Sequence, residues 1–195
     1  MQPNSFDKCQ AIERRSLEIL RPFICQRSLN GQYVIVEKGR LAKELQAHYG
    51  DVFMNRLTGG IASVEIKAEA ENRHQNLFIE VWSNRSRFNL GWIYKINADV
   101  LLYHFIESDE LFAMSLQELK RWLFWHKPGS HPNIYQYPLR VQKRHDQLND
   151  TWGACVPIRS ISSGLKSFKQ FRASTGELTN VTPNVARMEL ARGLR

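Results

Sequence analysis

The sequence has few cysteines, and none is spaced as a zinc ligand pair would be. Its three cysteines, Cys9, Cys25 and Cys155, are odd in number and widely separated, and no C-x-x-C pair occurs. Neither a disulfide framework nor a zinc knuckle is therefore expected. Reduced, buried thiols in a cytoplasmic protein are the simplest interpretation.

Several other signals are missing. No apolar run reaches the roughly 18 residues that a membrane-spanning helix needs, so no membrane partner is expected. Residues 1–10 lack the apolar core of a signal peptide. No G-x-x-x-x-G-K-[ST] phosphate loop and no G-x-S-x-G elbow occurs, which leaves an ATP-driven motor and a serine hydrolase unsupported. The spacing of His126, His131 and His145 matches no compact histidine–metal nuclease motif.

What the sequence has in excess is positive charge. Its 195 residues carry 27 Lys and Arg against 19 Asp and Glu, a formal charge of +8, and 43% hydrophobic residues suffice for a core. The excess lies in two stretches, 120–145 and 164–195, and the rest of the chain is slightly acidic. This distribution permits a polyanionic partner, with basic surfaces beside a near-neutral body.

Hydrophobic periodicity and turn residues predict alternating helices and strands. A helix over 7–21 is expected to end at Pro22, and a second helix over 38–49 at Gly50. Further elements are expected as strands at 33–36, 51–55, 61–68, 76–82, 98–106, 110–114 and 152–158, and as helices at 86–97 and 115–126.

These elements predict an α/β fold with a mixed central sheet flanked by helices. The last helix is expected to begin with a capping box formed by Ser115 and Glu118. One domain is predicted over 1–163, with a basic loop at 127–150, followed by a basic C-terminal tail over 164–195.

The strand at 61–69 carries the residues of chemical interest. Because strand side chains alternate between faces, Ser63, Glu65, Lys67 and Glu69 share one face, and the apolar residues between them form a core face. Asp51 begins the preceding strand and Glu80 lies on the following one. If the three strands pair as neighbours, their carboxylates converge.

Converging carboxylates repel one another unless a cation lies between them. Oxygen ligands suit Mg²⁺ or Mn²⁺, and such an ion activates water and neutralises charge on a phosphate. A lysine on the same strand face can orient the water or stabilise the phosphate. These are the parts needed for phosphodiester hydrolysis.

The pattern of Asp51 followed by Glu65-Ile66-Lys67 resembles the D…(D/E)-x-K signature of the PD-(D/E)XK nuclease superfamily, which includes restriction endonucleases and Holliday-junction resolvases. Its core of a helix, three strands, a helix and a further strand is similar to the order predicted from residue 7 to residue 106. Gly50 stands where the family often has proline.

The resemblance implies a restriction-endonuclease-like core and a set of roles. Asp51 and Glu65 would bind the metal, helped by the backbone carbonyl of Ile66, and Lys67 would assist the attacking water. The family often adds a glutamate on the first helix, for which Glu13 and Glu18 are the alternatives.

Other residues are candidates for supporting roles. Glu69 and Glu80 would support the metal site. Trp92, Tyr94, Trp122 and Trp125 are interpreted mainly as packing residues. Contacts to the DNA backbone are expected from five basic residues: Arg85, Arg87, Lys95, Lys143 and Arg144.

The sequence therefore predicts a cytoplasmic, metal-dependent DNA endonuclease that uses Mg²⁺, with Mn²⁺ able to substitute. The alternative is a nucleic-acid-binding module that does not cut, or a subunit that needs a partner. A homodimer would suit an enzyme that cuts two strands, and the sequence leaves that point open.

Overall fold

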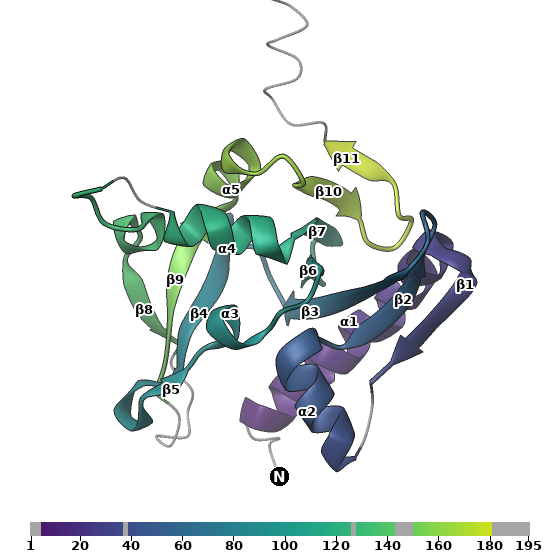
Figure 1. Ribbon diagram of the computed structural model, residues 1–195, viewed down its shortest axis with the longest axis horizontal. Coiled ribbons are helices and arrows are strands. Elements are labelled where there is room, and N and C mark those ends of the chain that lie inside the picture. Colours follow the sequence, from purple (N-terminus) through teal and green to yellow (C-terminus); the bar gives the residue numbers. More distant parts are fainter. Residues whose placement is uncertain (1–4, 37–38, 126–127, 143–149, 181–195) are drawn as a thin grey trace, which may run out of the picture.

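The computed structural model describes residues 5–36, 39–125, 128–142 and 150–180 (Figure 1). The elements in chain order are α1 (Ser5–Arg27), β1 (Ser28–Ile35), α2 (Arg40–Tyr49), β2 (Val52–Arg56), β3 (Ile61–Glu69), β4 (Asn76–Asn84), η1 (Arg85–Arg87), β5 (Asn89–Leu90), α3 (Trp92–Lys95), β6 (Val100–Phe105), β7 (Glu110–Ser115), α4 (Leu116–Phe124), η2 (Asn133–Gln136), β8 (Leu139–Gln142), β9 (Thr151–Pro157), α5 (Ile158–Gly164), β10 (Lys169–Arg172) and β11 (Leu178–Asn180).

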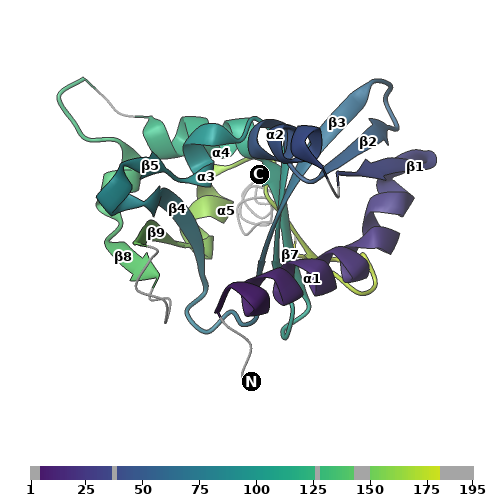
Figure 2. The same ribbon diagram turned by 90° about the horizontal axis from the view of Figure 1, so that it is seen from below.

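The strands form two sheets that lie side by side (Figure 2). The larger is a seven-stranded mixed sheet with the order β1-β2-β3-β6-β7-β10-β11, in which only the β3–β6 pair is parallel. The smaller is an antiparallel sheet with the order β5-β4-β9-β8. The predicted α/β class, with a mixed sheet flanked by helices, is confirmed.

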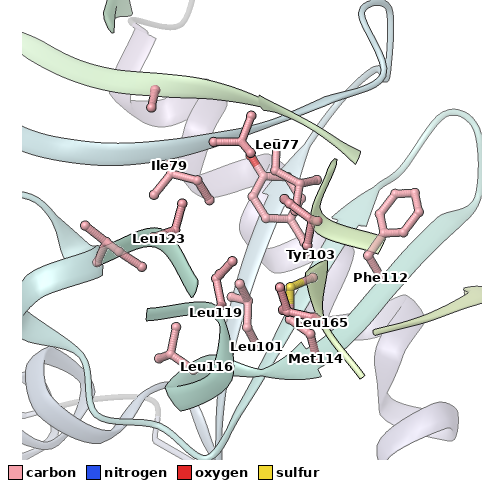
Figure 3. Packing of buried hydrophobic residues seen from close by; sticks show 14 of the residues in the cluster. Leu77, Ile79, Leu101, Tyr103, Phe112, Met114, Leu116, Leu119, Leu123 and Leu165 are labelled. Carbon is pink, nitrogen blue, oxygen red and sulfur yellow. The ribbon is translucent and has the colours of Figure 1, made fainter. Parts of the chain in front are cut away.

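The space between the two sheets holds the main hydrophobic core (Figure 3). Strand β6 sends Leu101, Tyr103 and Phe105 into it, and α4 adds one stripe of leucines. Burying each such side chain contributes roughly 1.5–3 kcal/mol. This core fixes the smaller sheet and α4 against one face of the larger sheet.

Helix α1 covers the opposite face of the larger sheet. Its Leu20, Phe23 and Ile24 pack with Val64 and Ile66 of β3 in a second core. The helix does not end at Pro22 as expected but continues through it to Arg27. Proline inside a helix costs about 3 kcal/mol, and burial of Phe23 and Ile24 just beyond it is large enough to offset that cost.

Three sequence predictions about the arrangement are wrong. Strand β4 does not pair with β3 but lies in the smaller sheet. The segment 86–97 is mostly not helical, since it contains η1, β5 and only one turn of helix, α3. Residues 164–180 are not a tail, because β10 pairs with β7, and Phe168 and Phe171 are buried. Residues 181–195 lie outside the described part of the chain.

The predicted helix boundaries at Gly50 and Ser115 are confirmed. Gly50 follows α2 with a φ of 97°, and the Ser115 hydroxyl accepts a hydrogen bond from the Glu118 backbone N–H at 3.3 Å. The reciprocal half of the capping box is replaced, because the Glu118 carboxylate instead accepts bonds from the backbone N–H groups of Lys166 and Ser167. Glu118 thus ties the C-terminal strands to α4.

Two smaller findings concern thiols and hydropathy. Cys25 is exposed and Cys155 is half-buried, so the expectation of buried thiols is wrong for Cys25.

Among the helices in the described ranges, none is both long enough and apolar enough to cross a membrane.

Candidate active site

Asp51 is fixed where the chain leaves α2 and enters the larger sheet. Its backbone N–H donates to the Val64 carbonyl at 2.8 Å, and its Oδ2 accepts from the Ile66 N–H at 2.9 Å. Gly50 permits this close approach, because a Cβ there would lie 2.6 Å from the Val64 oxygen. The Asp51 carboxylate therefore lies beside the middle of β3.

Glu65 and Lys67 share one face of β3, as the alternation predicts. Lys67 Nζ lies 2.5 Å from Glu65 Oε1, and the two side chains are 29% and 3% exposed. The expectation that this face points away from a core is wrong for Glu65, which is buried. Lys67 Nζ lies 5.6 Å from the centre of the Trp92 ring of α3.

The backbone of Ile66 faces the Asp51 carboxylate. In a strand, the N–H and C=O of one residue point to the same side, and consecutive residues alternate. Val64 directs its carbonyl toward Asp51, so Ile66 directs both its groups to that side as well. Strand β2 begins only at Val52, opposite Val64. The Ile66 carbonyl therefore faces the edge where β2 has not yet begun.

The acidic groups of this site are strongly perturbed. Burial raises the pKa of Glu65 to about 7, the Lys67 charge opposes that rise, and the charges of Asp51 and Glu13 add to it. Burial likewise raises the pKa of Asp51, against the effect of Lys67. Burial alone would lower the pKa of Lys67, yet the surrounding carboxylates raise it. Lys67 is therefore a firmly protonated cation between acids.

These residues lie in a cleft of about 900 Å³ lined mainly by α1, α2 and β3, and by Asp51 just before β2. Both Glu13 and Glu18 line it, but only Glu13 acts on the charges of both Glu65 and Lys67. Of the two first-helix alternatives, Glu13 is therefore the residue that the structure brings toward the site.

Three cationic residues of the cleft were not singled out in the sequence. Arg14 and Arg21 line it from α1, and Lys43 lines it from α2. The spacing of Arg14, Leu17, Glu18 and Arg21 at helical intervals was the available signal. Among the described residues, the positive charge that lines the cleft beside the acids comes from these two helices.

Two predicted supporting carboxylates lie elsewhere. Glu69 lies four residues beyond Glu65 on β3, about 13 Å along the strand, and accepts a hydrogen bond from the Tyr103 hydroxyl. Glu80 lies in the smaller sheet, where its Oε1 accepts from the Trp92 N–H at 3.3 Å. Glu80 thus contacts the helix that packs beside Lys67, without joining the carboxylates.

The three candidate DNA contacts that the structure describes also lie outside the cleft. Arg85 packs over the Trp152 ring at 4.4 Å in the smaller sheet, and Arg87 is exposed on η1. Lys95 is exposed on α3, next to Ile96, which does line the cleft. Lys143 and Arg144 lie outside the described residues.

The donor set suits a hard divalent cation that keeps some of its ligands on the substrate side. It consists of the Asp51 and Glu65 carboxylates and the Ile66 carbonyl. Mg²⁺ is commonly held by one or two carboxylates, with waters and substrate phosphates completing its shell. Within the described residues no group of three or more His, Cys, Asp or Glu side chains that could hold a metal occurs. A site here would depend on water and substrate for its remaining ligands.

Comparison of the chain with known protein families, with curated proteins and with solved structures found no match.

Proposed function

We propose that this protein is a metal-dependent DNA endonuclease with a restriction-endonuclease-like core. The observation that carries the proposal is the constellation in the cleft: Asp51 bonded to the backbone of β3, beside the Glu65–Lys67 pair. Two acids and one lysine leave a net negative charge when ionised, which a divalent cation would balance.

The topology supports the same proposal. Helix α1 is followed by the antiparallel strands β1, β2 and β3, with α2 inserted between β1 and β2, and β6 pairs with β3 in parallel. This order is similar to the family core of a helix, three strands, a helix and a further strand. The helix between β3 and β6 is the short α3, and β4 and β5 are diverted into the smaller sheet.

Each residue has a role that its surroundings suit. Asp51, Glu65 and the Ile66 carbonyl would hold Mg²⁺ or Mn²⁺, whose chemistry is the activation of water and the neutralisation of phosphate charge. Lys67 remains protonated, so it acts as a cation that orients the water or stabilises the phosphate. Arg14, Arg21 and Lys43 attract the DNA backbone to a cleft that its carboxylates would otherwise make repulsive.

The test is cleavage of duplex, branched and single-stranded DNA by the purified protein with Mg²⁺ or Mn²⁺. Glu65→Gln keeps the size of the side chain and should reduce cleavage by at least about 100-fold, the lower end of what a positioned catalytic group contributes. Glu69→Gln is the matched control, because it makes the same change on the same strand face and keeps an acceptor for Tyr103. It should cut as the native protein does.

The alternative, a module that binds nucleic acid without cutting, has one observation in its favour. Glu65 and Lys67 neutralise each other at 2.5 Å, and a buried ion pair can be purely structural. Absence of cleavage on every DNA form, together with salt-dependent DNA binding, would replace the nuclease with this module. Equal loss of activity in Glu65→Gln and Glu69→Gln would also contradict the assigned roles.

A further inference from the structure

Four aromatic residues lie on α3, at the end of α4 and on η2. We call the group of Tyr94, Phe124, Trp125 and Tyr135 the aromatic platform. Tyr94 and Phe124 stack with ring centres 5.1 Å apart and an interplanar angle of 29°. Tyr94, Trp125 and Tyr135 are 38%, 56% and 66% exposed. The expectation that Trp125 is a packing residue is therefore wrong, whereas Tyr94 packs against Phe124 and Trp92 is buried, both as expected.

Hydrogen bonds between the three elements hold the platform together. The Asn133 side chain at the start of η2 donates to the Trp122 carbonyl at 2.7 Å, and its backbone N–H donates to the Trp125 carbonyl at 3.3 Å. Lys120 Nζ of α4 donates to the Ile96 carbonyl at the end of α3 at 2.5 Å. The rings are therefore presented by fixed elements, so little conformational entropy is lost when a ligand stacks on them.

The platform has a positive border. Residues 92–98 and 119–142, which contain the four rings, include no acidic residue. Lys95 and Arg121 are exposed beside the rings, and Arg121 lies one helical turn from Trp125 on α4. Exposed rings beside cationic side chains match the faces of nucleobases joined by phosphates.

We propose that the aromatic platform binds unpaired bases of a nucleic-acid strand. Each base offers a flat face to a ring, and Lys95 and Arg121 meet the phosphates between bases. In a duplex these faces are stacked against neighbouring base pairs and cannot reach the rings. The platform therefore selects a single strand over a duplex, whatever the base sequence.

The position of α3 connects the platform to the cleft, and this step rests on the proposed nuclease function. Trp92 and Ile96 of this segment face Lys67 and the cleft, whereas Tyr94 belongs to the platform. A strand bound at the carboxylates would pass over α3 and place its next bases on the rings. The preferred substrate is then DNA with an unpaired segment beside the cut, such as a flap or a branch.

Binding is measured without cleavage, in EDTA, by the fluorescence anisotropy of a labelled thymidine oligonucleotide of about 20 nucleotides, longer than the roughly 4–16 nucleotides that such a surface covers. A duplex of equal length is the comparison. Trp125→Ala and Tyr94→Ala should each weaken single-strand binding about tenfold, the size expected for the loss of one stacked base. Trp125→Phe and Tyr94→Phe keep a ring and should restore most of it.

The control variant is Phe88→Ala, which removes an exposed ring outside the platform, at the end of η1. It should bind the single strand as the native protein does. Equal weakening of duplex and single-strand binding by Trp125→Ala would overturn the proposal. Unchanged single-strand binding in Trp125→Ala would also overturn it. If size-exclusion chromatography then showed that this variant had lost a dimer formed by the native protein, the rings would belong to a dimer interface instead. Because this assay measures binding and not cleavage, its result remains valid even if the protein proves not to be a nuclease.

Discussion

Protonation of a buried histidine should make this protein sensitive to acid. His104 of β6 lies under α1 with no exposed surface, and its Nδ1 is 2.9 Å from the hydroxyl of buried Ser16. Its Nε2 is buried and has no hydrogen-bond partner among the residues that the structure describes. Burial lowers the pKa of His104 from 6.5 to about 4, and the charge of Asp109 opposes this only in part.

The magnitude follows from this difference in pKa. Above pH 6.5 the imidazole is neutral in the folded and unfolded chains alike, so its protonation does not change the free energy of unfolding there. As the pH falls from 6.5 to 4, the unfolded chain binds a proton that the folded protein excludes, so stability declines. At about 1.4 kcal/mol for each unit of pKa difference, the loss approaches roughly 3 kcal/mol near pH 4.

The assay compares the native protein with His104→Asn, which keeps a polar group near Ser16 but does not titrate. Urea unfolding followed by tryptophan fluorescence at several pH values gives the free energy of unfolding of each. The advantage of the native protein over the variant should shrink by about 3 kcal/mol between about pH 7.5 and pH 4. Because other groups titrate equally in both proteins, a difference independent of pH would refute the burial argument.

Two further predictions concern backbone and anchoring. Gly50→Ala places a Cβ 2.6 Å from the Val64 oxygen at a φ of 97°, so it should destabilise the protein by at least about 2 kcal/mol. It should also reduce DNA cleavage, because it moves Asp51. A variant with native thermal stability would contradict the argument from backbone strain. Glu118→Ala removes the acceptor for the N–H groups of Lys166 and Ser167, so limited proteolysis should cut after α5 sooner than in the native protein. An unchanged cleavage pattern would mean that strand pairing alone holds this segment.

The elements that the sequence predicts well are those with strong local signals. Gly50 and Ser115 act through their own conformation and side chain, so the boundaries of α2 and α4 follow from the residues themselves. The alternation of β3 predicts correctly that Glu65 and Lys67 share a face. Asp51 joins them because only a short hairpin separates β2 from β3.

What the sequence does not predict depends on distant partners. Strand β4 has Leu77, Ile79 and Val81 at alternating buried positions, a pattern that suits any sheet with one covered face. Nothing in it specifies β9 rather than β3 as its partner, so Glu80 was placed in the wrong sheet. Residues 164–180 lack periodicity because β10 and β11 are short and rely on the edge of β7 for their register.

The interleaving of the two sheets along the chain affects how the protein unfolds. The chain begins in the larger sheet, visits the smaller one as β4 and β5, returns as β6 and β7, leaves again as β8 and β9, and comes back as β10 and β11. Neither sheet is formed by a contiguous piece of the chain. If either sheet unfolds, the hydrophobic core between the two sheets is exposed, and the other sheet loses the contacts that stabilise it. The molecule is therefore one cooperative unit, and the edge of β7 is covered only after synthesis has passed Arg172, the last residue of β10.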